Sequence, residues 1–401
     1  MTTPSDATPA DSTSSDSAAP PRFEGRPERF RVMLEDDHPH LFDGGMGTEI
    51  YARGVFINRS FDELNLTQPD LVKAVHQEYV QAGAEIVETN TFGASRPKLE
   101  AFGLGDQTVE INRRGAEIAR EAVGERALVA GAIGPLGIRM EPFGPTSRDE
   151  ARAFFAEQAG ALAAGGADLL VLETFGSFEE LKEAIAGARE ACELPVVAQM
   201  TIGQDLRTTF GTDPDHFIPQ LEEAGADVLG LNCSVGPAAM LAGVERIRPL
   251  TDLPLCVMPN AGLPREVHGR KMYMASPEYM AKYAARLIKM GARFVGGCCG
   301  TTPEHTARMH DAVRSLHPAR VQPHPHPVAE DVVLAKDDRA QTIGSFGLSG
   351  GFNLIHFNPT LQRFGGMPGA SRLEGKTRIT LEGAMPEGKV RVDKLDIQGE
   401  D

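Results

Sequence analysis

One unit recurs along most of this 401-residue chain: an amphipathic helix, a Gly-Ala joint and a short apolar strand. A glycine at the joint can adopt the left-handed conformation that ends a helix, and the alanine lets the next strand pack close to that end. Alternating helices and strands form a parallel sheet, so the repeat predicts the α/β fold class. The joints are Gly83-Ala84, Gly166-Ala167, Gly225-Ala226 and Gly291-Ala292.

The apolar segments are nearly continuous rather than alternating, which is typical of parallel strands buried on both faces. Residues 70–80 between two of them show the 3.6-residue helical period, and Pro69 stands where a first helical turn tolerates proline. Eight such strands over roughly 250 residues predict a (β/α)8 TIM barrel, with a doubly wound open sheet as the alternative. The predicted strands are 40–43, 84–89, 127–133, 168–173, 195–201, 226–232, 254–259 and 292–297.

The composition changes at both ends of the predicted barrel, which we place at residues 28–317. Residues 1–27 contain almost no large apolar side chains, so we expect a disordered N-terminal arm. Residues 318–401 are predicted to be a Pro/His linker followed by a short C-terminal extension of unknown role. Its two alternating runs, 377–381 and 389–393, predict a small hairpin or an arm that packs on the barrel or on a second subunit.

Charge and cysteine usage exclude several classes of protein. The net charge is -16 and no block of Lys and Arg occurs, so we expect no nucleic-acid partner. The apolar runs are too short to span a membrane. Five cysteines are an odd number and no signal peptide is recognisable, so we expect a cytoplasmic protein without a disulfide framework.

The residues that follow the strands should converge at one mouth if the barrel forms. Three of the five cysteines and two carboxylates are among them, which marks this end of the barrel as the candidate site. The strand-end residues are Asp43-Gly44-Gly45, Thr89-Asn90-Thr91, Gly134-Pro135, Glu173-Thr174, Thr201, Asn232-Cys233, Asn260 and Cys298-Cys299.

Three thiols from two strand ends predict a metal site with one open position, because structural zinc is usually closed by four protein ligands. Zinc on three thiolates is a weak electrophile, but it can deprotonate a substrate thiol and keep that sulfur nucleophilic. Such a thiolate can displace a methyl group without a general base. Cys298 and Cys299 alone would also fit a vicinal pair in a glycine turn, either inert or redox-active.

An amino-acid pocket is predicted beside the thiols. Asp43 and Glu173 could hold a substrate ammonium, and the backbone N–H groups of Gly44, Gly45 and Met46 could receive a carboxylate. Asp43 before a glycine run would also fit a simple turn cap, whereas Glu173 at the end of a buried strand needs a partner. The amides Asn90 and Asn232 complete the predicted substrate contacts.

Several segments resemble the homocysteine S-methyltransferase family, the zinc barrel of betaine-homocysteine methyltransferase and of the N-terminal module of cobalamin-dependent methionine synthase. The resemblance covers about residues 39–317. It implies zinc on Cys233, Cys298 and Cys299, homocysteine's amino group near Asp43 and Glu173, its carboxylate on the Gly44 turn, and Asn260 as a displaceable zinc ligand. The matching segments are 43–48, 88–92, Glu173-Thr174, 230–233, 259–264 and 296–300.

The resemblance implies methylation of homocysteine to methionine but leaves the methyl donor open. Betaine is disfavoured because the chain has no Trp and only five Tyr for an aromatic cage, and because Gly93 and Thr174 stand where the betaine enzymes carry tyrosines. A sulfonium donor, S-methylmethionine or S-adenosylmethionine, needs no further domain. A methyl-corrinoid or methyl-folate system would have to reside on a separate chain, because no Asp-x-His-x-x-Gly cobalamin motif occurs.

Other functions remain open on the sequence alone. A metal-dependent hydrolase or lyase would need histidine or carboxylate ligands, which are scarce among the strand-end residues. The chain could also be a thiol-methyltransferase subunit acting on another thiol, or a non-catalytic zinc or redox subunit.

Overall fold

The structure, a computed structural model, describes residues 26–56, 59–267 and 270–318, together with five short strands between residues 346 and 399. The chain divides into two compact units, Met1–Pro325 and His326–Asp401. The predicted disordered arm, residues 1–27, lies outside the described residues except for its last two, which begin the first helix.

Eight parallel strands form the predicted barrel, one at each predicted position. Their order is β1-β10-β7-β6-β5-β4-β3-β2, and a parallel bridge between Phe42 and Ile86 joins the two ends of this order, β1 and β2. The ring is thereby closed, so the open-sheet alternative is wrong. The strands are β1 (His40–Leu41), β2 (Ile86–Glu88), β3 (Leu128–Ile133), β4 (Leu169–Phe175), β5 (Val196–Met200), β6 (Val228–Asn232), β7 (Leu255–Met258) and β10 (Ala292–Val295).

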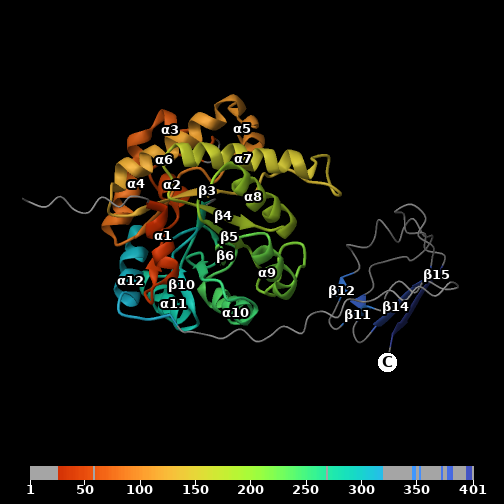
Figure 1. Cartoon of the computed structure of the whole chain (residues 1–401). Coiled ribbons are helices and arrows are strands. Elements are labelled where there is room, and N and C mark those ends of the chain that lie inside the picture. The colour runs from red at the N-terminus through yellow and green to blue at the C-terminus, as the bar shows by residue number, and fades with distance from the viewer. Residues whose placement is uncertain are drawn as a thin grey trace, which may run out of the picture. The chain divides into compact units, whose positions relative to one another are not determined.

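Helices surround the strands (Figure 1). The four joint glycines have φ angles of 102°, 92°, 96° and 102°, which confirms the left-handed conformation predicted for each helix end. The helix predicted over 70–80 is α4, with Pro69 in its first turn. The helices are α1 (Arg26–Glu35), α2 (Met46–Ala52), α3 (Leu64–Thr67), α4 (Pro69–Gln81), α5 (Arg96–Glu100), α6 (Thr108–Val123), α7 (Arg148–Ala164), α8 (Phe178–Ala191), α9 (Pro214–Glu223), α10 (Pro237–Ile247), α11 (Pro277–Lys289) and α12 (Pro303–Val313), with short 3-10 turns at Gly105–Gln107 and Arg248–Leu250.

Helix α1 covers the N-terminal end of the barrel. Its side chains Phe30 and Met33 belong to the same buried cluster as the inward-facing residues of the strands. The Phe30 ring stacks on Phe294 of β10 with 5.3 Å between centroids, and Arg29 donates to the carbonyl of Glu125 just before β3. A larger core layer lies between the strands and the outer helices. With the lower end closed by α1, only the C-terminal end of the barrel remains for a site.

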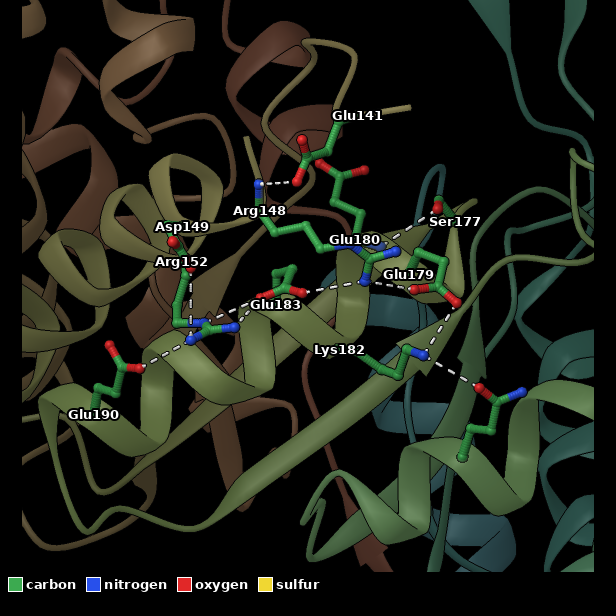
Figure 2. A network of polar contacts seen from close by, with 11 residues as sticks. Glu141, Arg148, Asp149, Arg152, Ser177, Glu179, Glu180, Lys182, Glu183 and Glu190 are labelled. Carbon is green, nitrogen blue, oxygen red and sulfur yellow. Dashed lines mark hydrogen bonds and ion pairs between the residues drawn. The ribbon is translucent and has the colours of Figure 1, made fainter. Parts of the chain in front are cut away.

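An ion-pair network joins α7 to α8 (Figure 2). Glu183, which is buried, lies 2.8 Å from Arg152 and 3.4 Å from Arg148. Lys182 bridges Glu179 at 3.0 Å and Gln220 of α9 at 3.1 Å. The network fixes α8, and α8 follows the strand that carries Glu173.

The loop from β7 to α11 contains an antiparallel hairpin, β8 (Arg265–Val267) with β9 (Arg270–Met272), which the sequence analysis did not predict. None of the described helices is both long enough and apolar enough to cross a membrane.

The second unit contains short antiparallel strands. Strand β14 (Thr377–Glu382) includes the first predicted alternating run and pairs with β11 (Phe346–Leu348) and β15 (Lys394–Gly399). The second predicted run, residues 389–393, lies outside the described residues. Strands β12 (Phe352–Asn353) and β13 (Arg372–Leu373) form a separate pair.

Candidate metal and substrate site

Three cysteine sulfurs converge at the C-terminal mouth of the barrel. The sulfur of Cys299 lies 3.8 Å from that of Cys233 and 4.0 Å from that of Cys298. All three sulfurs lie within 4.8 Å of one another. Cys233 directly follows β6 and the pair follows β10, so the closed barrel brings together residues that lie 65 positions apart.

The backbone around the cysteines is held in an unusual conformation. Cys233 and Ser234 have φ angles of 57° and 58°, although neither is a glycine. The N–H groups of Cys233 and Cys298 donate to the carbonyls of Met258 and Pro259 at the end of β7, both at 3.0 Å. Gly300 has a φ of 81°, and a Cβ at this position would lie 2.2 Å from Tyr273. The two hydrogen bonds direct the sulfurs toward one point. The positive φ of Gly300 and the close approach of Tyr273 require a glycine at position 300.

The sulfur spacing fits a tetrahedral metal ion. Sulfurs bound at about 2.3 Å from a tetrahedral zinc lie roughly 3.8 Å apart. Hydrogen bonds from Cys233 and Cys298 lower the pKa of Cys299. The hydrogen bonds with Cys233 and Cys299 in turn raise the pKa of Cys298 well above its usual range. A divalent cation would allow all three thiols to ionise.

Asn260 lies beside the sulfur cluster. Its side-chain oxygen accepts a hydrogen bond from the backbone N–H of Cys299 at 3.0 Å, and its backbone N–H donates to the carbonyl of Val235 at 3.1 Å. The amide thus orients the cysteine loop. Its role as a displaceable metal ligand stays a prediction.

Two predicted carboxylates face the same mouth, and a third joins them. Asp43 is buried; one of its oxygens accepts from the N–H of Glu88 at 3.0 Å, and the other has no protein partner. One oxygen of Glu88 also lacks a partner. Burial raises the pKa of Asp43 and of Glu88 well above their usual ranges. Burial, with the nearby charge of Cys299, raises the pKa of Glu173 to about 7. Orphaned buried acceptors fit a cationic ligand group such as an ammonium.

Asn232 connects the carboxylates to the cysteines. Its side-chain N–H group donates to Glu173 at 3.1 Å and to the hydroxyl of Thr174 at 2.8 Å. Its oxygen accepts from the N–H of Thr174 at 2.8 Å, which supports the positive φ of 65° at that residue. The Asn232 nitrogen lies 4.0 Å from the sulfur of Cys298.

The glycine turn after β1 packs tightly against the cysteine loop. A Cβ on Gly44 would lie 2.7 Å from the hydroxyl oxygen of Thr301, and one on Gly45 would lie 2.8 Å from the carbonyl oxygen of Cys298. The N–H of Gly45 donates to the carbonyl of Thr301 at 3.1 Å. Of the three N–H groups predicted to receive a substrate carboxylate, that of Gly45 is therefore engaged within the protein.

Asn90, the other predicted substrate amide, is buried at the end of β2. It donates to the carbonyl of Phe61 at 2.7 Å and to the side chain of Asn65 at 3.2 Å. These bonds hold the loops that follow β1 and β2. A substrate contact by Asn90 stays a prediction.

Two residues near the site were missed by sequence reasoning. Glu88 lies within the predicted strand 84–89 and was therefore not counted among the strand-end residues. A charged residue within an apolar run is nevertheless a sequence signal for a site residue. Tyr273 lies after the unpredicted hairpin, and a hydrogen bond with its hydroxyl contributes to lowering the pKa of Cys299. No local pattern marks Tyr273.

An open cavity of about 270 Å³ is lined in part by Ser234, the residue that follows Cys233 in the chain. The loop after β5 provides most of its lining, and that lining carries both a carboxylate and a guanidinium. The residues are Ile202, Gly203, Asp205, Arg207, Thr208, Thr209 and Ser234.

Comparison with known proteins identifies relatives of the barrel. The chain is 34% identical over 294 residues to methionine synthase of Mycobacterium tuberculosis, and 34% identical over 291 residues to that of Mycobacterium leprae. Each match covers 68% of this chain and 24% of the relative, so the chain spans about a quarter of the length of these curated relatives.

Among solved structures, the homocysteine methyltransferase MmuM of Escherichia coli in its metallated form is similar, with 27% identity and a TM-score of 0.61. The match covers 70% of this chain and 99% of that one. The profile of one family, described as homocysteine S-methyltransferase, matches residues 40–313, which contain every residue of the site described above. The chain therefore belongs to the homocysteine S-methyltransferase family.

Proposed function

We propose that this barrel transfers a methyl group to the thiol of homocysteine, with zinc held by Cys233, Cys298 and Cys299. The observation that carries the proposal is the spacing of the three sulfurs, 3.8 and 4.0 Å for two of the pairs, beside orphaned buried carboxylate oxygens. A structural zinc would need a fourth protein ligand, whereas three thiolates leave a position for the substrate sulfur.

Bound zinc would make one contribution to the chemistry, because it would lower the pKa of the homocysteine thiol. The thiolate sulfur then attacks the methyl carbon of the donor. A new S–C bond forms as the donor's bond to that methyl breaks, and the electron pair of the broken bond remains on the donor. With a sulfonium donor the products are methionine, a neutral thioether and the proton that the homocysteine thiol has lost.

The remaining site residues bind and orient homocysteine. Asp43 and Glu173 take its ammonium, since both are buried and Asp43 has an oxygen without a partner. Asn232 keeps Glu173 directed toward this position. The turn at Gly44 receives the carboxylate through the N–H groups that are not engaged with Thr301.

We propose the methyl donor from the cavity that Ser234 lines. The cavity beside Ser234 supports a small sulfonium amino acid, because Asp205 and Arg207 carry charges complementary to an ammonium and a carboxylate. The alternative is a methyl-corrinoid or methyl-folate system on a separate chain. We also propose a cytoplasmic location, which the odd number of cysteines supports.

The test is a side-by-side assay of methionine formation from homocysteine with each donor. The wild-type protein should hold one zinc per chain and use at least one of S-methylmethionine, S-adenosylmethionine or protein-borne methyl-corrinoid. Cys233→Ala should lose both zinc and activity. Cys192→Ala is the matched control, because Cys192 lies at the end of α8 away from the sulfur cluster.

Two outcomes would contradict the proposal. Unchanged metal content in Cys233→Ala would remove the zinc site. Normal zinc with no methylation by any donor would instead favour a different thiol substrate or a non-catalytic zinc subunit.

A further inference from the structure

Lys98 is a cation without an anionic partner at the rim of the barrel mouth. Its ammonium lies 4.4 Å from the centre of the Phe92 ring. Among the described residues no carboxylate oxygen approaches it within ion-pair distance, unlike Lys73 or Lys182. A half-buried ammonium that has given up part of its hydration without gaining a counter-ion is in an unfavourable position unless a ligand supplies one.

The backbone places Lys98 over the mouth rather than on the outer surface. It belongs to α5, which follows β2, and its alkyl chain packs against the loop after β3, where a Cβ on Gly137 would lie 3.5 Å from the lysine Cε. The Phe92 ring beneath the ammonium packs against Gly134 in the same loop. The lysine is therefore held between the loops that follow two neighbouring strands.

Acidic side chains from other loops surround Lys98 at longer range. Burial lowers the pKa of Lys98, and the charges of Asp62 after β1, Glu180 at the start of α8 and Glu173 at the end of β4 oppose that shift. Asp62 and Glu180 are engaged with backbone N–H groups, those of Gly93 at 2.9 Å and Leu136 at 2.8 Å, so they are held in place and not free to move to the lysine. Figure 2 shows Glu180 beside Ser177 at the start of α8. Among the described residues, Lys98 is therefore a lysine near several carboxylates that makes no ion pair with any of them.

This pattern matches the charges of an amino acid. Asp43 and Glu173 can take an ammonium, and Lys98 adds a positive charge for a carboxylate, whether that carboxylate also contacts the N–H groups of the Gly44 turn or the guanidinium of Arg207. Glu173 connects Lys98 to the cysteines. The charge of Lys98 lowers the pKa of Glu173, and Glu173 accepts a hydrogen bond from Asn232, which lies beside Cys298.

We propose that Lys98 binds the carboxylate of an amino-acid ligand at the barrel mouth. The inference rests on the proposed methylation of homocysteine, and the carboxylate has two possible sources, homocysteine itself or an amino-acid sulfonium donor. Lys98 is a specificity residue for that ligand and takes no part in the bond changes.

The test compares Lys98→Gln and Lys98→Arg with wild-type protein in steady-state assays, using homocysteine and S-methylmethionine as the varied substrates in turn. Lys98→Gln should raise the KM of one substrate about 10- to 100-fold, the range expected for a lost hydrogen bond to a charged group, while kcat changes little. Lys98→Arg should recover part of the loss. The substrate whose KM rises identifies the source of the carboxylate.

Analogues without the carboxylate separate binding from a general structural effect. With 3-aminopropane-1-thiol in place of homocysteine, or (3-aminopropyl)dimethylsulfonium in place of S-methylmethionine, wild-type and Lys98→Gln proteins should have the same KM. Lys182→Gln is the matched control, since that lysine also lies over an aromatic ring, Phe178, at 5.1 Å but is paired with Glu179. It should leave both KM values unchanged.

The proposal is overturned if Lys98→Gln changes neither KM, or if it changes the KM of the analogues equally. Calorimetric binding of homocysteine and of S-methylmethionine to wild-type and Lys98→Gln proteins tests Lys98 even if no methyl transfer is found, so failure of the proposed function remains distinguishable. An equal thermal transition in the two proteins excludes a folding defect.

Discussion

At the residue scale, Asn232 is the side chain that ties the parts of the site together. It bonds Glu173 and Thr174 through both ends of its amide and lies near Cys298. Because it is fully buried, each of these bonds is made in a low-dielectric environment, where loss of a partner is costly. The position of the Glu173 carboxylate relative to the sulfurs therefore depends on one amide.

We expect Asn232→Ala to lower kcat/KM for homocysteine by about 10- to 100-fold, the range typical of residues that orient a metal site. The cause is loss of the orientation of Glu173 and of the support for the Thr174 backbone. Steady-state kinetics with zinc analysis would measure it. Asn112→Ala, which removes an equally buried amide bonded to Ala94 and Thr108, controls for the stability cost and should leave KM unchanged. Equal kinetic losses in both variants would contradict a specific role for Asn232.

At the element scale, α1 is a short helix with a large structural effect, because it closes the lower end of the barrel. Phe30 is completely buried against Phe294, whereas Val32 on the same helix is 57% exposed. The sequence analysis did not assign this helix, since ten residues with three arginines show little apolar periodicity.

Phe30→Ala should therefore lower the free energy of unfolding by about 3–5 kcal/mol, the usual effect of removing a buried phenylalanine side chain. Val32→Ala, its neighbour on the exposed face, should change it by less than about 0.5 kcal/mol. Denaturant titration of the two variants measures both values. Similar small effects would show that α1 does not contribute to the barrel core.

A second contact holds α1 in a pH-dependent way. The buried ring of His40 lies 2.7 Å from Glu85 and 2.9 Å from Asp36, the residue that follows α1, and Asp36 also pairs with Arg293 at 3.3 Å. Burial lowers the pKa of His40, but the hydrogen bonds and charges of Glu85 and Asp36 outweigh burial and raise the pKa above its usual 6.5. The protonated imidazole is therefore the stabilising form.

The sign of the pH effect follows from this shift. Stabilisation by His40 is complete below the unfolded-state pKa and is lost as the pH rises through the raised folded-state pKa. We expect the stability difference between wild-type and His40→Gln proteins to shrink in denaturant titrations as the pH is raised from below 6.5 through the interval that contains the raised folded-state pKa. A difference that stays constant over this interval would exclude a charged His40.

At the scale of the whole barrel, exposed apolar side chains gather on the loops of the mouth. Among the described residues, Phe143 and Phe210 are 84% and 74% exposed. Exposed apolar groups rimmed by polar residues are typical of contact surfaces. The others on these loops are Phe56, Phe92, Ile138, Leu263, Met272 and Met274.

Substitution of the exposed residues Phe143 and Phe210 would distinguish a protein-borne methyl donor from a free sulfonium. If the methyl group arrives on a protein, the double variant Phe143→Ser/Phe210→Ser should lower kcat/KM for that protein-borne donor about tenfold or more, because exposed aromatic residues often dominate such contacts. Its kcat/KM with a free sulfonium should be unchanged. Parallel assays with both donors provide the comparison, and equal losses would point to a local folding defect instead.

The arrangement of strands could be predicted because its signals are local. An apolar run, the glycine at a helix end and the helical period each depend on neighbouring residues, so all eight strands and the conformation of the four joints were predicted correctly. The hairpin β8–β9 was missed because it lies within a loop whose length and composition do not mark strands. The convergence of Cys233 with Cys298 and Cys299 was predicted only through the fold, since strand ends of a barrel must meet.

By itself, the sequence determined the order of helices and strands and the identity of the residues at the strand ends, because both depend on short-range backbone preferences and on the pattern of buried side chains. Only the tertiary structure decided what those residues do. Ring closure brought the three sulfurs within 4.8 Å of one another, burial raised the pKa of Asp43 and Glu173, and packing of the loops left Lys98 without an ion pair among the described residues. Distances and solvation depend on residues far apart in the chain, and no local pattern encodes them.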